Sequence, residues 1–176
     1  MVEAMEIQKG FKKTEVGSIP NEWDAVPIRQ LYNFKQGVQC PVERQFSNDA
    51  KGLKRFIRII DLTSASEPIR YIQDPGTNHH VKKDDLFMVR YGSPGLLGYG
   101  YEGVIANNLF RLIPKKTLNN NFYFHYLTYI QDRILGISGS STMPAINFSS
   151  LSSLLVVYPH LKAEQTAIAE ALNDTD

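Results

Sequence analysis

The feature that most constrains this chain is a series of short apolar runs, rich in β-branched residues, with little chain between them. Residues 56–62, 69–72, 85–90 and 103–113 each have the length and composition of a buried or half-buried strand. A parallel pair of strands needs a crossover of a dozen or more residues, usually a helix, and no helical spacing separates these runs. The sequence therefore predicts a mixed, largely antiparallel sheet.

Helical spacing begins only after residue 120. The next apolar side chains lie three or four positions apart on one stripe, which predicts a single helix over 121–136 with Asn120 or Asn121 as its cap. Three more elements are expected: a short capped helix over 147–154, a strand over 154–158 and a final helix from residue 161 onward. The predicted fold class is α+β, with a few helices beside the sheet.

Other segments are too polar or too rich in glycine for regular structure. They are a turn-rich entry arm over 12–23, a polar connection over 33–52, a glycine-rich turn over 92–100 and a Gly-Ser loop over 136–142. A connection as long as 33–52 is usually functional or disordered. We therefore look for binding residues in these segments first.

A length of 176 residues suits one buried core, so we expect one domain over 1–160 followed by a helical segment over 161–176. Hydrophobic residues make up 43% of the chain and charged residues 21%, as in ordinary globular proteins. No apolar run approaches the roughly 20 residues that span a bilayer, and the first ten residues do not resemble a secretory signal. The expected location is the cytoplasm. The single cysteine, Cys40, cannot form an internal disulfide.

The formal net charge of +1 is low for a nucleic-acid-binding protein, but the charge is unevenly distributed. Residues 27–60 contain seven basic and two acidic side chains, and residues 86–131 contain four and one. Residues 132–176 instead contain two basic and five acidic side chains. If the basic segments share a face, that face can meet phosphates. The alternative is a scattered, solvated charged surface.

Sequence patterns for catalysis or cofactor binding are weak. Residues 98–103 (GYGYEG) match the dinucleotide-binding string, but a strand-like segment follows them where a helix would be required. The adjacent His79 and His80 lack further metal ligands nearby, so neither a metal nor a cofactor is predicted. The serines of the Gly-Ser loop have no histidine and acid pattern beside them. The chain also contains no Pro-Pro pair, which an adenine methyltransferase of the Asn/Asp-Pro-Pro-aromatic type would need.

Landmarks along nearly the whole chain resemble, in order, those of the specificity subunits of type I restriction-modification systems. The quoted segments are KKTEVGSIPNEW, FIRIIDL, DDLFMVRYGSPGLLGYG with VIANNLFRLIP, ISGSSTMPAINFSSLSSLLVVYP and AEQTAIAEALNDTD. The most specific is the C-terminal set: a Gly-Ser loop, an Ile146-Asn147 to Leu151 step, an apolar strand, Pro159, and Glu164-Gln165 opening a helix.

This resemblance implies one target-recognition domain, which reads one half of a split DNA site and is not itself an enzyme. In that family two such domains are separated by long spacer helices, and residues 161–176 would begin the first spacer. The implied partners are double-stranded DNA, methyltransferase subunits, restriction subunits, and either a second recognition domain or another copy of the chain.

The expected DNA contacts come from three segments, 33–58, 90–100 and 139–142, which we expect to converge on one concave face. Arginines would read base edges, whereas lysines and hydroxyls would position the domain on phosphates. The candidates are Lys35, Arg44, Lys51, Lys54, Arg55, Arg58, Arg90, Tyr91, Ser140 and Thr142. Arg58, at the centre of a predicted strand, faces either DNA or solvent.

The final helix has a narrow apolar stripe that suits packing against a partner helix, with Ile168, Ala171 and Leu172 as contacts. The alternative is that this helix folds back on its own domain. Two rival functions also stay open: a protein-interaction or scaffold module of the same fold that does not bind DNA, and a small enzyme of unrecognised type.

Overall fold

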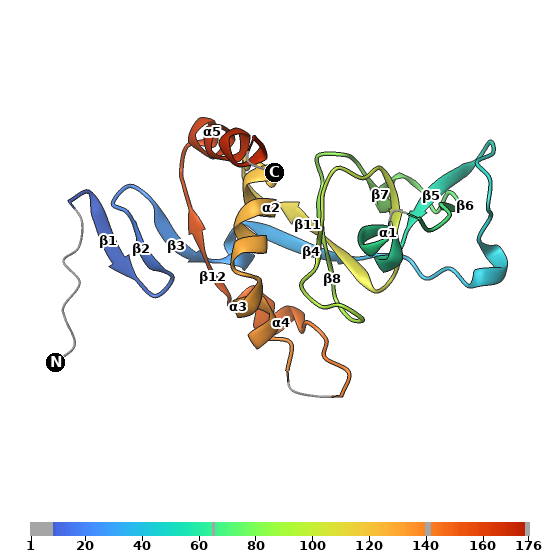
Figure 1. The fold of residues 1–176 in the computed structure, drawn as a ribbon, viewed down its shortest axis with the longest axis horizontal. Helices are drawn as coiled ribbons and strands as arrows, with labels where there is room; N and C mark the ends of the chain where they lie inside the picture. The colour runs from blue at the N-terminus through green and yellow to red at the C-terminus, as the bar shows by residue number, and fades with distance from the viewer. Residues whose placement is uncertain (1–8, 65, 140–141, 175–176) are drawn as a thin grey trace.

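A computed structural model describes residues 9–64, 66–139 and 142–174. The molecule is elongated: a small hairpin lies at one end, helices and a sheet form the middle, and a second sheet lies at the other end (Figure 1). The element mix confirms the predicted α+β class. No helix in the described ranges is long and apolar enough to cross a membrane.

The central sheet is entirely antiparallel and has the strand order β4-β11-β8-β9. Its strands are β4 (Tyr32–Gln36), β11 (Leu109–Pro114), β8 (Leu86–Val89) and β9 (Leu97–Gly98). Strand β4 occupies the beginning of the segment predicted to be a polar connection. That prediction is wrong at this point because Phe34 packs against Phe110 of β11, with ring centroids 5.7 Å apart.

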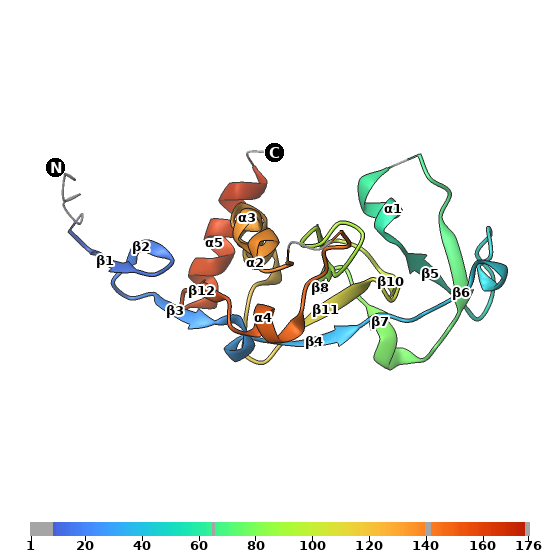
Figure 2. The same cartoon turned by 90° about the horizontal axis from the view of Figure 1, so that it is seen from below.

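The second sheet has the order β6-β5-β10-β7 and contains one parallel pair. Its strands are β6 (Arg70–Gln73), β5 (Leu53–Ile57), β10 (Gly103–Ile105) and β7 (His80–Val81). Strands β5 and β10 run parallel, with Val104 beside Phe56. The sequence showed no crossover helix because the chain between these strands forms only the five-residue α1 and then β6 to β9, returning through the central sheet (Figure 2).

Two small antiparallel pairs complete the strands. The predicted entry arm is in fact a hairpin of β1 (Phe11–Thr14) and β2 (Gly17–Pro20), and β3 (Asp24–Pro27) pairs with β12 (Leu155–Tyr158). Single 3-10 turns follow β3, precede β5 and precede β7: η1 (Ile28–Gln30), η2 (Val42–Arg44) and η3 (Thr77–His79).

The helices correct three predictions. Strand β5 ends at Ile57, and Arg58 is the N-cap of α1 (Ile59–Thr63), so residues 56–62 are not one strand. The single helix predicted over 121–136 is divided into α2 (Asn120–Tyr129) and α3 (Gln131–Gly136), because Ile130 leaves the helical conformation with ψ of 20°. The side chain of Asn119, not of Asn120 or Asn121, caps α2. Helix α4 (Phe148–Ser152), capped by Asn147, and helix α5 (Lys162–Asn173) lie where expected.

Two hydrophobic cores meet at strand β8. Leu86 and Met88 lie in the core that the helices cover, which we call the body, whereas Phe87 and Val89 lie in the core beneath the second sheet, which we call the distal lobe. Alternate residues of a strand point to opposite faces, so one strand supplies both cores. This shared wall fixes the distal lobe on the body.

Candidate nucleic-acid interface

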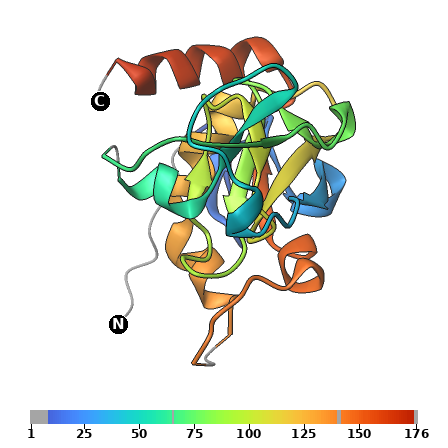
Figure 3. The same cartoon turned by 90° about the vertical axis from the view of Figure 1, so that its right-hand side faces the viewer.

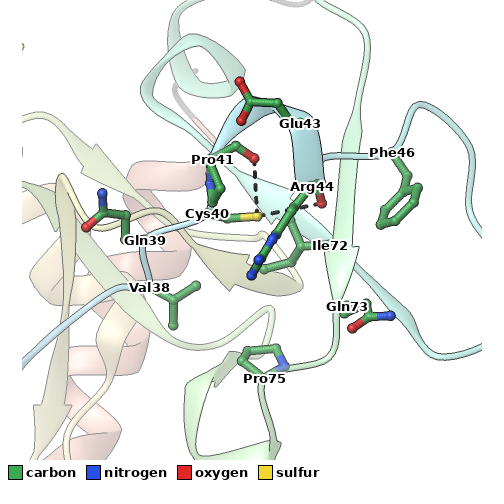
Figure 4. Close-up of a pocket in the computed structure, with 10 residues that line it drawn as sticks. All are labelled: Val38, Gln39, Cys40, Pro41, Glu43, Arg44, Phe46, Ile72, Gln73 and Pro75. Atoms are coloured by element: carbon green, nitrogen blue, oxygen red, sulfur yellow. Dashed lines mark hydrogen bonds between the residues drawn. The ribbon is translucent and has the colours of Figure 1, made fainter.

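Arg44 lies at a surface hollow of about 410 Å³ in the distal lobe. Figure 4 shows its side chain reaching from η2 across the hollow toward Val38 and Pro75, while Glu43 points away. Arg44 is exposed, and within the described residues its guanidinium has no hydrogen bond or ion pair. Its planar fork is therefore available to an outside acceptor.

Cys40 also lines the hollow. The Cys40 thiol donates to the carbonyl oxygens of Pro41 and Arg44, both at 3.7 Å. Burial raises the pKa of this thiol, and the neighbouring Arg44 charge offsets part of that rise. The thiol thus contacts the carbonyls of Pro41, the N-cap of η2, and of Arg44, its last residue.

Three further basic residues lie on β5 and the turn before it. Lys51 and Lys54 are exposed. Arg55 is half-buried: its guanidinium lies over the ring of Tyr101, 5.3 Å from the centroid, and its Nε is buried without a hydrogen-bond partner in the described structure. The two lysines can reach phosphates, whereas Arg55 is held by an aromatic ring.

Arg58 is engaged within the protein. Its Nε and Nη2 donate to the carboxylate of Asp61 at 2.9 and 3.2 Å, and Nη2 also donates to the carbonyl of Pro68 at 2.9 Å. The Asp61 carboxylate in turn accepts from the Arg58 backbone N–H. Arg58 therefore does not lie on either face of a strand, because it is the N-cap of α1.

The hairpin after β8 and the loop before α4 lie side by side. Tyr91 forms a backbone bridge with Ala145, and the Ile146 N–H donates to the Arg90 carbonyl at 2.8 Å. The Arg90 guanidinium donates to protein acceptors on both sides of this junction. Thr142 is exposed on the same loop, and Ser140 lies outside the described residues.

The remaining candidate, Lys35, lies on the central sheet opposite Arg111. Its ammonium donates to the Asn78 carbonyl at 2.6 Å, which ties β4 to η3. The nearby carboxylate of Asp85 is paired with Arg111 at 3.0 Å. Lys35 therefore lies apart from the hollow at Arg44.

The three segments expected to converge do so only in part. The second segment adjoins the loop that carries the third through Tyr91 and Ala145, which lies just beyond 139–142. The first meets the second at Gln36, whose side-chain oxygen accepts from Arg90, and in the core that Leu96 shares with Phe56 and Ile57. Figures 1 and 3 show the loop before α4 projecting to one side, away from η2. The described candidate residues other than Lys35 thus form two groups, one on the distal lobe and one at the hairpin junction.

Folding also changes the charge pattern read from the sequence. Residues 38–81, which build most of the distal lobe, contain six basic and five acidic side chains, so the excess of 27–60 is largely balanced. Some of this balance is local pairing, as in Arg58 with Asp61 and His80 with Asp74. The exposed cations Arg44, Lys51 and Lys54 are left as the positive groups of this surface.

The segment that matches the dinucleotide-binding string is a link between strands. Strand β9 ends at Gly98 and β10 begins at Gly103, with no helix after it. Gly98 is required because a Cβ there would lie 2.1 Å from the Phe87 ring. His80 pairs with Asp74 at 2.7 Å, and the described residues contain no group of three or more potential metal ligands.

Comparison with known proteins identifies the family to which this chain belongs. The family model for the type I restriction modification DNA specificity domain matches residues 20–176, which is most of the chain. The chain belongs to this family. DNA target recognition is the general role of type I specificity subunits.

Individual relatives agree with this assignment. The chain is 27% identical over 180 aligned residues to a putative type I restriction enzyme MjaX specificity subunit from Methanocaldococcus jannaschii, covering 96% of this chain and 40% of that protein. It thus spans about two fifths of the length of this curated relative.

Solved structures show the same fold. The S subunit of a type I restriction-modification system from M. genitalium superposes with a TM-score of 0.64 at 20% identity, over 86% of this chain and 38% of that one. The HsdS subunit from Thermoanaerobacter tengcongensis gives a TM-score of 0.69 at 16% identity, over 96% and 40%. At these identities the likeness concerns the fold.

In this specificity domain α5 packs along α2 of its own chain, which is the alternative we left open for that helix. Gln165 and Ala169 are buried there, and Ile168 is half-buried against the body core. The Gln165 side chain accepts from the Asn119 N–H at 2.8 Å and donates to the Pro159 carbonyl at 2.7 Å. Ala171 and Leu172, the other expected partner contacts, are exposed.

Three glutamines at these sites were not predicted from the sequence. Gln39 and Gln73 line the hollow beside Arg44, and Gln36 joins the strand β4 to Arg90. Planar amides are suited to base edges or to buried networks, but nothing in a local pattern distinguishes such a glutamine from a solvated one. Only the strand pairing that brings Gln73 and Gln39 to one hollow could have revealed them.

Proposed function

We propose that this domain binds double-stranded DNA sequence-specifically and reads one half of a bipartite target. The observation that carries the proposal is the group of exposed cations on the distal lobe, with the free Arg44 fork above the hollow and two lysines on β5 and the turn before it. Family membership supports the same role.

In this proposal the arginine and the lysines have different roles in DNA binding. Arg44 contacts a base edge, because a guanidinium pairs bidentately with guanine in the major groove. Lys51 and Lys54 contact phosphates, which fixes the register of the domain without specifying a base. Lys35, Tyr91, Ser140 and Thr142 contribute further backbone or sugar contacts, and Arg55 stays over Tyr101 as a shape-defining residue.

The domain acts as a non-catalytic subunit of an assembly in the cytoplasm. Methyltransferase and restriction subunits would perform the chemistry, and a second recognition domain or another copy would read the other half-site. Helix α5 would be the start of a spacer helix, following a recognition domain that ends near residue 160. Its alanine face, Ala163, Ala167 and Ala171, is exposed and allows close approach of another helix.

The test is a selection from a pool of random duplexes at low salt, followed by an affinity measurement on the selected sequence. We expect a short common motif and an affinity that falls steeply with salt. If three phosphates are contacted, the loss is roughly 40-fold between about 50 and 200 mM salt. Absence of both a motif and a salt dependence would refute the proposal.

A second candidate is a protein-interaction module that uses the same fold. The observation in its favour is the nearly balanced charge of the distal lobe, since nucleic-acid-binding surfaces are usually strongly basic. The same selection separates the two functions, because an interaction module would return no sequence motif while still binding partner subunits.

A further inference from the structure

Arg90 lies where three segments of the chain meet. Its Nη1 donates to the Gln36 side-chain oxygen at 3.0 Å, at the end of β4, and its Nε donates to the Ile146 carbonyl at 3.2 Å, in the loop before α4. The Arg90 backbone N–H donates to the Asn108 carbonyl at 2.8 Å, which anchors the residue to the turn before β11. One side chain thus connects β4, the hairpin and the loop.

The fourth contact of Arg90 connects the loop to the hydrophobic core. The guanidinium lies over the ring of Phe148, 4.7 Å from its centroid, at the first position of α4. The Phe148 ring packs on Phe110 and Phe34 of the central sheet, with centroids 4.9 and 5.6 Å apart. Packing in the body therefore fixes the position of the Phe148 ring. Arg90 lies over this ring and donates to the Ile146 carbonyl, so it links Ile146 to the same core.

Gln36 is itself held in place. Its side-chain nitrogen donates to the Asn107 carbonyl while its oxygen accepts from Arg90. In the described residues no carboxylate lies within ion-pair distance of Arg90, so these neutral acceptors and the Phe148 ring hold its charge. A planar guanidinium can donate in two directions and stack at once, which an ammonium cannot do.

We propose that Arg90 is a positioning residue that holds loop residues 142–147 against the hairpin, and that this placement sets base preference at one position of the target. The inference rests on the proposed DNA-reading function. It assigns Arg90 a different role from a direct base reader, because its donors face protein acceptors. Gln36 and Phe148 complete the positioning cluster.

The first measurement needs no DNA. Hydrogen exchange at Ala145 and Ile146 is followed in the 176-residue chain and in Arg90→Lys and Gln36→Leu variants. The matched control is Arg70→Lys, which makes the same change at a half-buried arginine whose Nη1 donates to Ser47 at 2.7 Å in the distal lobe. We expect exchange at these amides to accelerate by roughly tenfold in the first two variants and to be unchanged in the control.

The second measurement is selection from random duplexes with the same proteins. Arg90→Lys keeps the charge, so a phosphate contact would survive it, whereas loss of positioning should reduce the preference for one base by roughly tenfold. Unchanged exchange, or faster exchange with an unchanged base preference, would overturn the inference alone. Failure of the unsubstituted chain to bind any duplex would instead overturn the proposed function, and the positioning role with it.

Discussion

Strand β8 supplies Leu86 and Met88 to the body and Phe87 and Val89 to the distal lobe, yet the two regions are stabilised differently. The body buries a larger core with many aromatic rings under its helices, and it includes the fully buried Tyr123. Burial raises the pKa of the Tyr123 hydroxyl, which donates to the Val157 carbonyl.

The distal lobe has a smaller core, and individual polar contacts hold much of its chain. They include Arg58 with Asp61, His80 with Asp74, and Arg70 with Ser47. Since stability follows buried apolar surface, most of it should come from the body. The distal lobe can then vary its exposed residues at little cost to the stability of the whole domain.

The largest effect is expected from Phe110→Ala in the body. Phe110 is fully buried between Phe34 and Phe148, so its loss should destabilise the fold by about 3–5 kcal/mol. The same change at Phe46 in the distal lobe, where 44% of the residue is exposed, should cost only about 1–2 kcal/mol. Urea unfolding of both variants measures the difference, and equal losses would show that the body and the distal lobe do not differ in this way.

Gly103→Ala should be the most damaging small change in the distal lobe. Gly103 has φ of 150°, and a Cβ there would lie 2.4 Å from the Arg55 carbonyl oxygen, beside the parallel β5–β10 pair. We expect a loss of about 3 kcal/mol. Gly100→Ala is the control: it has φ of 85° but open space around it, and should cost about 1 kcal/mol. Similar thermal unfolding of the two variants would show that the close approach is unimportant.

Arg44→Ala should leave folding intact and change DNA recognition. Because Arg44 is exposed above the hollow, we expect base preference to relax at one position by about 1–3 kcal/mol. Lys51→Ala should instead weaken binding to all sequences alike and reduce the salt slope by about one. Binding measurements on a panel of single-base variants distinguish these patterns. A uniform loss for Arg44→Ala would make it a phosphate contact.

The smallest effect is expected at Asp74. The hydrogen bond from His80, together with one from the Gly76 N–H, lowers the pKa of this carboxyl. A lowered folded-state pKa contributes stability above the unfolded value of about 3.9, and this contribution is lost as the pH falls through the folded-state pKa. The difference in Tm between the unsubstituted chain and Asp74→Asn should therefore be small near pH 6 and shrink further toward pH 3. A difference that does not change with pH would argue against this pair.

Much of the fold could be predicted from local patterns in the sequence. The strands at 70–73 and 86–89, the short helix capped by Asn147, and the end of α3 at Gly136 all follow from apolar runs, capping residues and glycine. The candidate cations at Arg44, Lys51 and Lys54 were also found, and all three are exposed. Such features depend on residues close together in the chain.

Other features could not be read this way. The run at 56–62 suits both strand and helix, and the Arg58–Asp61 capping contact decides for a helix after Ile57. The break at Ile130 and the parallel pairing of β5 with β10 likewise depend on packing against distant segments. Helix α5 shows the same limit, because its stripe fits either a partner or α2, and the buried hydrogen bonds of Gln165 fix it on α2.

The sequence by itself determined the α+β class, the family resemblance and several of the elements, because these follow from periodicity, turn chemistry and ordered landmarks along the chain. The tertiary structure alone decided which arginines are free, since Arg58 and Arg90 are held by Asp61, Gln36 and Ile146, while Arg44 is not. The reason is physical: a guanidinium is occupied or available according to acceptors that folding brings from elsewhere in the chain.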